Sequence, residues 1–198
     1  THYIRGTPNG IFADRDSGLV WSPSHYTWMD TNYPAGTPRC GYPIEIQALW
    51  IRLLRQLSRL APTEPEWEKW ALKAEQSLQR YFWLPKNKWF ADGLWAEDKR
   101  PAAQARVDDA LRPNQFLPIS FGLFDAEKSR RALRAALRHL VIPGAMRSLA
   151  PLPVSCLAPV FGPEGRLLND PGNPYWPRYE GDEDTRRIIS ARKATKHE

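Results

Sequence analysis

The pattern that most constrains the fold is a run of apolar residues at helical spacing that follows Pro43. Apolar residues recur every three or four positions, while Arg52, Arg55 and Arg59 occupy the opposite side. Residues with this spacing lie on one face of a helix, and proline is favoured in a helix's first turn. We therefore predict an amphipathic helix, whose buried stripe consists of Ile46, Trp50, Leu53, Leu54, Leu57 and Leu60.

A second helical pattern begins a few residues later. Thr63 and Glu66 have the spacing of a capping box, and Pro65 lies in the expected first turn. Because only a short turn separates the two patterns, we predict an antiparallel αα-hairpin. The stripe of this second helix consists of Trp67, Trp70, Ala71, Ala74, Leu78 and Phe82.

A second hairpin is predicted further along the chain. Its first helix starts near Pro113 or Asn114 and carries Phe116, Leu117, Ile119 and Phe121. Its second helix covers residues 126–141, with Asp125 as the N-cap. Its buried face is expected to contain Leu133, Ala136, Leu137 and Leu140.

Long segments rich in proline, glycine, asparagine and aspartate separate these helices. They cover residues 1–42, 84–106 and 142–179, with a short strand pair expected around residues 89–95. The alternation of strand and helix that builds a parallel sheet is missing from the sequence pattern. We predict an all-α fold in which helices form the scaffold and long loops at one end carry the site.

Charge and cysteine usage exclude several classes of protein. The net charge is +6, but basic residues alternate with acidic ones, except in the dense run from Arg186 to His197, so nucleic acid is not the expected partner. No apolar run is long enough to span a membrane, and no secretory signal is present. We expect a soluble, cytoplasmic protein that binds no membrane.

The spacing of the cysteines and histidines also indicates that no metal site is present. Cys40 and Cys156 are far apart and are expected to be free thiols, and the four histidines are dispersed. The sequence contains no glycine-rich phosphate loop, no metalloprotease motif and no serine nucleophile elbow. We expect neither a metal nor a cofactor.

Three loop segments carry polar and aromatic side chains that suit a carbohydrate site. In the first, Trp28 and Met29 precede Asp30, so that an apolar ring can desolvate a carboxyl group and raise its pKa for work as a general acid. Residues 112–115 supply a guanidinium and two amides, and residues 173–182 form an aromatic and acidic loop. Asp30 can equally be a turn residue, Asn114 a helix cap, and the third segment a surface loop held by buried rings.

The order of these segments resembles the amylo-α-1,6-glucosidase family. The resemblance extends over about residues 3 to 187 and is carried by Thr27-Trp28-Met29-Asp30, Gly36-Thr37-Pro38-Arg39, Gly41 to Trp50, Arg112-Pro113-Asn114-Gln115, Met146 to Ala150, and Tyr175 to Asp184. It implies an (α/α)6 toroid of six helical hairpins, of which residues 1–187 form a part. It also implies inverting hydrolysis of α-1,6 branch linkages in glycogen or related α-glucans, without a cofactor.

Site residues follow from the same resemblance. By motif match Asp30 is the general acid, and the residues expected to bind or orient the sugar or to support the acid are Trp28, Arg39, Glu45, Arg112, Asn114 and Gln115. An inverting enzyme also needs a second carboxylate, about 6.5 to 9.5 Å from the first, to activate water. The resemblance implies that this base lies outside the chain.

The sequence departs from the family pattern after Arg187. Residues 188–198 form a basic tail that is expected to be disordered and that resembles a truncated or altered reading frame. Four predicted helices are too few to close a toroid, so we expect exposed apolar faces and little hydrolysis by the isolated chain. Two alternatives remain, a non-catalytic module that binds α-glucan or a protein partner, and a basic helical protein that binds nucleic acid.

Overall fold

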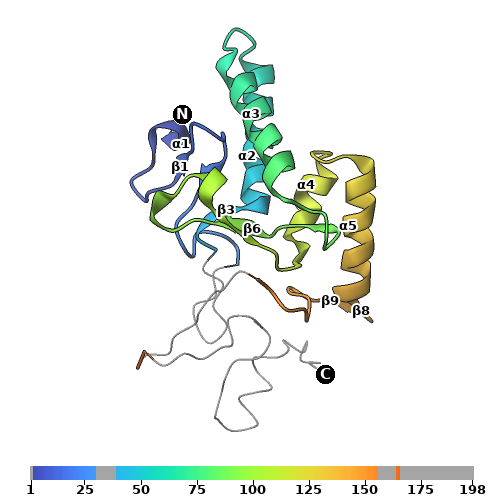
Figure 1. The fold of residues 1–198 in the computed structure, drawn as a ribbon. Helices are drawn as coiled ribbons and strands as arrows, with labels where there is room; N and C mark the ends of the chain where they lie inside the picture. The colour runs from blue at the N-terminus through green and yellow to red at the C-terminus, as the bar shows by residue number, and fades with distance from the viewer. Residues whose placement is uncertain (1, 30–38, 156–163, 166–198) are drawn as a thin grey trace, which may run out of the picture.

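The computed structural model describes residues 2–29, 39–155 and 164–165 (Figure 1). Its most prominent feature is an antiparallel hairpin of α2 (Ile44–Leu60) and α3 (Glu66–Tyr81), which projects from the rest of the molecule. Both helices were predicted from their apolar spacing. The first hairpin is therefore confirmed.

The buried face of α2 differs from the predicted stripe. Ile44, Ala48, Ile51 and Leu54 are fully buried, whereas Leu60 is 82% exposed. Leu53, also predicted to be buried, is 40% exposed. The buried row begins at the first residue of the helix, because α2 packs there against the strand segment that precedes it as well as against α3.

The start of α3 also differs from the prediction. Pro65 occupies the N-cap position, and no side chain forms a capping hydrogen bond there. The predicted capping box of Thr63 and Glu66 is therefore wrong. The helix relies on packing instead, since Ala71, Ala74 and Leu78 are fully buried in the core shared with α2.

The second hairpin is shorter than predicted at its start. A 3₁₀ turn (Pro113–Gln115) leads into α4 (Phe116–Ser120), and no side chain caps either element. By contrast, α5 (Ala126–His139) begins as predicted, because the Asp125 carboxylate accepts a hydrogen bond from Lys128 N at 2.8 Å.

The buried face of α5 was predicted wrongly in part. Ala136 and Leu140 are buried as expected, but Leu133 and Leu137 are 39% and 65% exposed. The small residues Ala132 and Ala136 form the contact face instead. Small side chains allow the helix to lie close to β5, so that the larger leucines are turned away.

Short strands occupy the segments between the helices. Within the described residues, nine strands form four antiparallel sheets. The largest has the order β3-β6-β7 and pairs Gly41 with Trp95 and Trp95 with Arg106. The strands are β1 (Phe12–Ala13), β2 (Val20–Trp21), β3 (Gly41–Pro43), β4 (Trp83–Leu84), β5 (Trp89–Phe90), β6 (Gly93–Trp95), β7 (Arg106–Asp108), β8 (Val141–Ile142) and β9 (Ala145–Met146).

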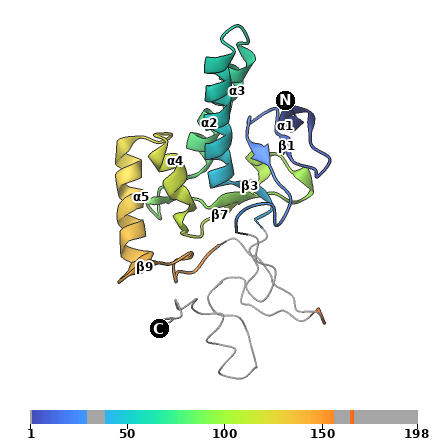
Figure 2. The same cartoon turned by 180° about the vertical axis from the view of Figure 1, so that it is seen from behind.

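The described part of the chain is therefore a mixed α and β structure, and the predicted all-α toroid is wrong. Seen from behind, β3 and β7 lie beneath the lower end of α2 (Figure 2). Within the described residues, parts of the segments predicted as long loops pair through their backbones, as β3 pairs with β6. The predicted basic tail, residues 188–198, lies outside the described residues.

One core joins the first hairpin to the sheets. Its largest fully buried side chains include Tyr42, Phe82 and Phe90, and the ring of Phe90 stacks on Phe124 at 3.7 Å between centroids. A smaller cluster lies under α5 and consists of Leu111, Ala136, Leu140 and Ala150. Of the helices in the described ranges, none has the length and apolar character needed to cross a membrane.

Gly41 is predicted to be required for the close approach of β3 and β6. Its φ is +118°, and an added Cβ would overlap the carbonyl oxygen of Leu94 and lie 2.7 Å from Ala96 N. Gly41→Ala should lower the free energy of unfolding by at least about 3 kcal/mol, measured by urea denaturation. Gly122→Ala is the matched control, because Gly122 also has a positive φ, +69°, but a Cβ there meets no atom within 4 Å.

The control should cost only about 1 kcal/mol, the usual penalty of a left-handed conformation for alanine. Equal destabilisation by the two substitutions would contradict a steric role for Gly41.

Candidate functional site

A cluster of buried charged and polar side chains lies where the first turn of α2 meets the central sheet. Arg39 precedes β3, and Glu45 lies in the first turn of α2. Asp92 lies in the turn between β5 and β6, and Asn114 lies in the 3₁₀ turn before α4. All four are at most 6% exposed. We refer to Arg39, Glu45, Asp92 and Asn114 as the polar network.

Arg39 binds two carboxylates at once. Both of its terminal nitrogens donate to the Glu45 carboxylate, with NH2 to Oε2 at 2.7 Å, while Nε donates to Asp92 Oδ2 at 2.8 Å. NH2 also donates to the backbone oxygen of Asp92 at 3.1 Å. Burial by itself lowers the pKa of Arg39. The charges of Asp92 and Glu45 raise this pKa by more than burial lowers it, so the guanidinium remains charged.

Asp92 is the point at which the other members meet. Its Oδ1 accepts a hydrogen bond from Asn114 Nδ2 at 2.7 Å, and its Oδ2 lies 3.4 Å from Arg112 Nε. Arg112 Nε is buried and forms no hydrogen bond within the described residues. One carboxylate thus faces two guanidinium groups and one amide. Such a buried charge is retained because it is paired on both oxygens.

A second carboxylate, Asp108, lies beside the polar network on β7. Its backbone oxygen accepts from Asp92 N at 2.9 Å, and its Oδ1 accepts from Ala110 N at 3.1 Å. Burial and the negative charge of Asp92 raise the pKa of Asp108 to about 6, against the opposing effect of Arg112 and Arg39. Asp108 therefore changes charge closer to neutral pH than an ordinary aspartate does.

The polar network also fixes the segment that carries Trp28. Arg39 NH1 donates to Thr27 Oγ1 at 3.1 Å, and Thr27 Oγ1 in turn donates to Met29 O at 3.0 Å. Trp28 Nε1 donates to Asn114 Oδ1 at 3.0 Å, although the Trp28 side chain is 64% exposed. The indole is thus held at one edge while its ring remains open to solvent.

The structure brings together most of the predicted site residues. Arg39, Glu45, Arg112 and Asn114 surround Asp92, and Trp28 lies at the surface above them. The burial of Arg39 and Glu45 favours support of the Trp28 segment over direct contact with a ligand. The predicted general acid, Asp30, and the aromatic loop of residues 173–182 lie outside the described residues.

Gln115 has a different setting from the other predicted residues. It is 1% exposed, and its Oε1 accepts a hydrogen bond from Phe90 N at 3.2 Å. Its Nε2 is buried without a hydrogen-bond partner among the described residues. Gln115 therefore ties the turn before α4 to β5, on the core side of the polar network.

Asp92 and Asp108 were missed by the sequence analysis. Asp92 lies in the segment predicted as a strand pair, between Phe90 and Trp95, where its role as a buried counterion has no local signature. The available signal was indirect. Arg39 and Arg112 were both assigned to one site, and two buried guanidinium groups require carboxylates to pair with them.

The described residues contain no cluster of histidine, cysteine or acidic side chains that can hold a metal ion. What the arrangement offers is a rigid base of paired charges beneath an exposed aromatic ring. A ring held in this way suits stacking against the apolar face of a sugar.

Comparison with known proteins identifies a family for this chain. Residues 1–158 match the family model described as amylo-alpha-1,6-glucosidase. No curated protein matches the chain. The matched residues include the whole polar network, the Trp28 segment and Asp30.

Asp92→Asn should strongly destabilise the fold. The substitution removes the carboxylate that pairs directly with Arg39 and lies beside Arg112. Breaking a buried ion pair by removing one partner typically costs about 3 to 5 kcal/mol. The free energy of unfolding in urea measures the effect. As a control, Asp125→Asn at the exposed start of α5 should leave the denaturation midpoint unchanged, because asparagine caps helices as well as aspartate. A stable Asp92→Asn variant would contradict the central position of Asp92.

Asp108 is predicted to make stability depend on pH between about 4 and 6. Its pKa in the folded protein, about 6, is above the reference value of 3.8, so the folded state holds a proton more tightly than the unfolded state. The favourable contribution is complete below pH 3.8 and is lost as pH rises through 6. Asparagine does not ionise, so Asp108→Asn removes the loss of stability that occurs when Asp108 becomes charged.

Relative to wild type, Asp108→Asn should therefore gain about 2 kcal/mol in stability between pH 4 and pH 7. Urea denaturation of both proteins across this range measures the change. A difference between them that does not vary with pH would contradict the raised pKa of Asp108.

Proposed function

Because the chain belongs to the amylo-alpha-1,6-glucosidase family, we propose that it contributes to the hydrolysis of α-1,6 branch linkages in glycogen or a related α-glucan. The proposed reaction is an inverting one. A carboxylic acid protonates the glycosidic oxygen, while a carboxylate activates a water molecule on the opposite face of the sugar. We assign the acid to Asp30.

The observation that carries this proposal is the exposed ring of Trp28, fixed above the polar network. Its indole N–H is already bound to Asn114, so the ring is oriented before a ligand arrives. Binding then loses little side-chain freedom, which favours affinity. The flat apolar face of an indole matches the C–H face of a glucose ring.

The position of Asp30 in the sequence supports its assignment as the acid. It directly follows Trp28 and Met29, and all three residues of the segment before it are bound to the polar network. Asn114 Nδ2 contacts Met29 Sδ at 3.2 Å. Apolar neighbours raise the pKa of a carboxyl group, which allows it to hold a proton at neutral pH.

The polar network itself supplies no catalytic base. Glu45 and Asp92 are each bound to Arg39, and both are buried. A carboxylate held in this way does not activate water efficiently, because its charge and its lone pairs are engaged. We therefore assign the base to neither residue.

This same observation favours a second candidate function. A chain with an exposed, fixed Trp28 and with Glu45 and Asp92 engaged in ion pairs suits an α-glucan-binding module without catalysis. The two candidates share the binding surface and differ in the role of Asp30. Binding and hydrolysis must therefore be measured separately.

Trp28→Ala should weaken glucan binding by about ten- to a hundredfold, the usual contribution of one stacked aromatic ring. Isothermal calorimetry with a branched maltooligosaccharide measures this loss. Trp67→Ala is the matched control, because the Trp67 indole bonds to the exposed Glu64 at the start of α3, away from the polar network. Equal effects of the two substitutions would contradict a sugar platform at Trp28.

In a protein that carries this chain together with the catalytic base, Asp30→Asn should reduce glucose release from a phosphorylase limit dextrin by about a hundredfold or more, since it removes the proton donor. Glucan affinity should stay within about twofold, because asparagine keeps the shape of the side chain. A coupled glucose assay and calorimetry measure the two properties on the same proteins. Binding without any Asp30-dependent release of glucose would reject the hydrolase proposal in favour of the binding module.

A further inference from the structure

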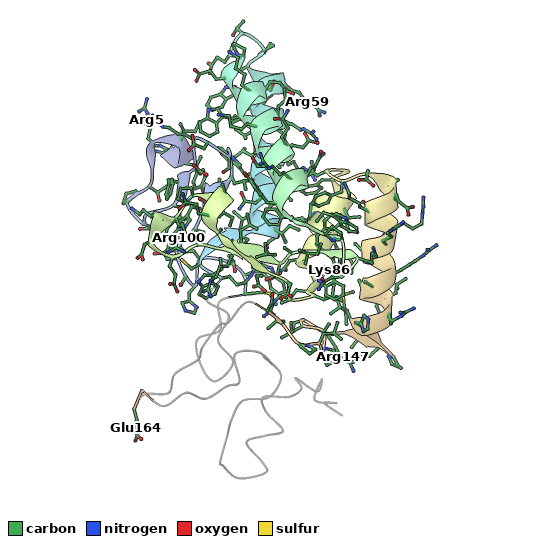
Figure 3. The ribbon with its side chains drawn as sticks, in the orientation of Figure 1. Arg5, Arg59, Lys86, Arg100, Arg147 and Glu164 are labelled. Atoms are coloured by element: carbon green, nitrogen blue, oxygen red, sulfur yellow. The ribbon has the colours of Figure 1, made fainter. Side chains whose placement is uncertain are left out.

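A groove on the side of the first hairpin that faces α4 is lined by three arginines. It lies between α2 and the turn that follows α4 and has a volume of about 300 Å³. Figure 3 shows Arg59 on the side of the hairpin that faces α4 and α5. The lining residues are Arg52, Arg55, Gln56, Arg59, Ser120, Phe121 and Leu123.

The spacing of the arginines explains why they share this groove. Arg52, Arg55 and Arg59 are three and four positions apart, so a helix places them in one row. The row begins about 10 Å along the helix axis from Glu45, given the rise of 1.5 Å per residue, and ends about 20 Å from it. The groove is therefore separate from the polar network.

Two of the three guanidinium charges lack a carboxylate partner among the described residues. Arg55 forms an ion pair with Glu75 of α3. Arg52 lies over the ring of Phe121, 4.6 Å from its centroid, and Arg59 has no ion-pair partner in the described ranges. Like charges three and four residues apart on a helix repel each other. An anion in the groove would relieve this repulsion.

The neighbouring side chains indicate which kind of anion fits. Guanidinium groups bind phosphate through paired hydrogen bonds, and the stacking of Arg52 on Phe121 restricts the orientation of its donors. Gln56 offers an amide, and the Ser120 hydroxyl, which donates to Leu117 O at 2.8 Å, still has free lone pairs. These groups suit hydroxyls, and a volume of about 300 Å³ is at the lower end for small-molecule sites.

We propose that this groove binds a small phosphate monoester whose body carries hydroxyl groups, such as a hexose phosphate. The phosphate contacts Arg52 and Arg59, and the hydroxyl-bearing body lies against Gln56, Ser120 and the apolar Leu123. Because the groove shares no residue with the polar network, this inference is independent of the proposed glucosidase function.

Calorimetric titration of the full 198-residue chain with glucose 6-phosphate tests the proposal, with glucose and inorganic phosphate as comparison ligands. We expect glucose 6-phosphate to bind at least tenfold more tightly than either of them and to bind more weakly as salt is raised. Arg52→Gln and Arg59→Gln should each weaken binding at least tenfold. Arg138→Gln, at an exposed arginine of α5, is the matched control and should leave affinity unchanged.

Three results with the ligands would overturn the proposal. They are absence of glucose 6-phosphate binding, equal affinity for glucose, and equal affinity for inorganic phosphate. An equal loss of affinity in Arg138→Gln would also overturn it, since the effect would then follow overall charge. Thermal unfolding of each variant without ligand checks that the fold is intact, which is expected because Arg52 and Arg59 are both exposed.

Discussion

The two-sided ion pairing of Arg39 is the interaction on which the rest of the described structure depends. One guanidinium joins the start of α2, through Glu45, to the turn between β5 and β6, through Asp92. Buried charges of this kind are costly unless every partner is present. The network therefore requires the hairpin, the central sheet and the turn before α4 to be assembled together. It also fixes the positions of these three elements relative to one another.

The position of the exposed Trp28 depends indirectly on that arrangement. Its indole is fixed by Asn114, and Asn114 is fixed by the Asp92 carboxylate. A surface ring is otherwise free to change rotamer, with a cost in entropy when it binds a ligand. The buried charge pairs support the segment, while the Trp28 ring is the part that is open to contact. Support and contact are thus divided between different residues. This division explains why residues predicted from one family resemblance differ so much in exposure.

The regular helices were predictable because their signal is local. Apolar residues three and four positions apart indicated α2, α3 and α5, and Asp125 indicated where α5 begins. The burial of individual leucines was less predictable. Leu133 and Leu137 have the right spacing for a core face, but the small Ala132 and Ala136 allow the closer contact, and only the neighbouring element decides between the two faces.

By itself, the sequence determined where the longer helices lie, the family, and part of the group that surrounds the polar network, including Arg39, Glu45 and Asn114. The tertiary structure alone decided the mixed fold and the centre of the site. The strands are only two or three residues long, which is too short for an alternating pattern to predict them. They also pair residues far apart in the sequence, such as Gly41 with Trp95. Asp92 is 53 positions from Arg39, and Asn114 is 86 positions from Trp28. Contacts over such separations depend on how the whole chain packs, whereas helical spacing is set within a few residues.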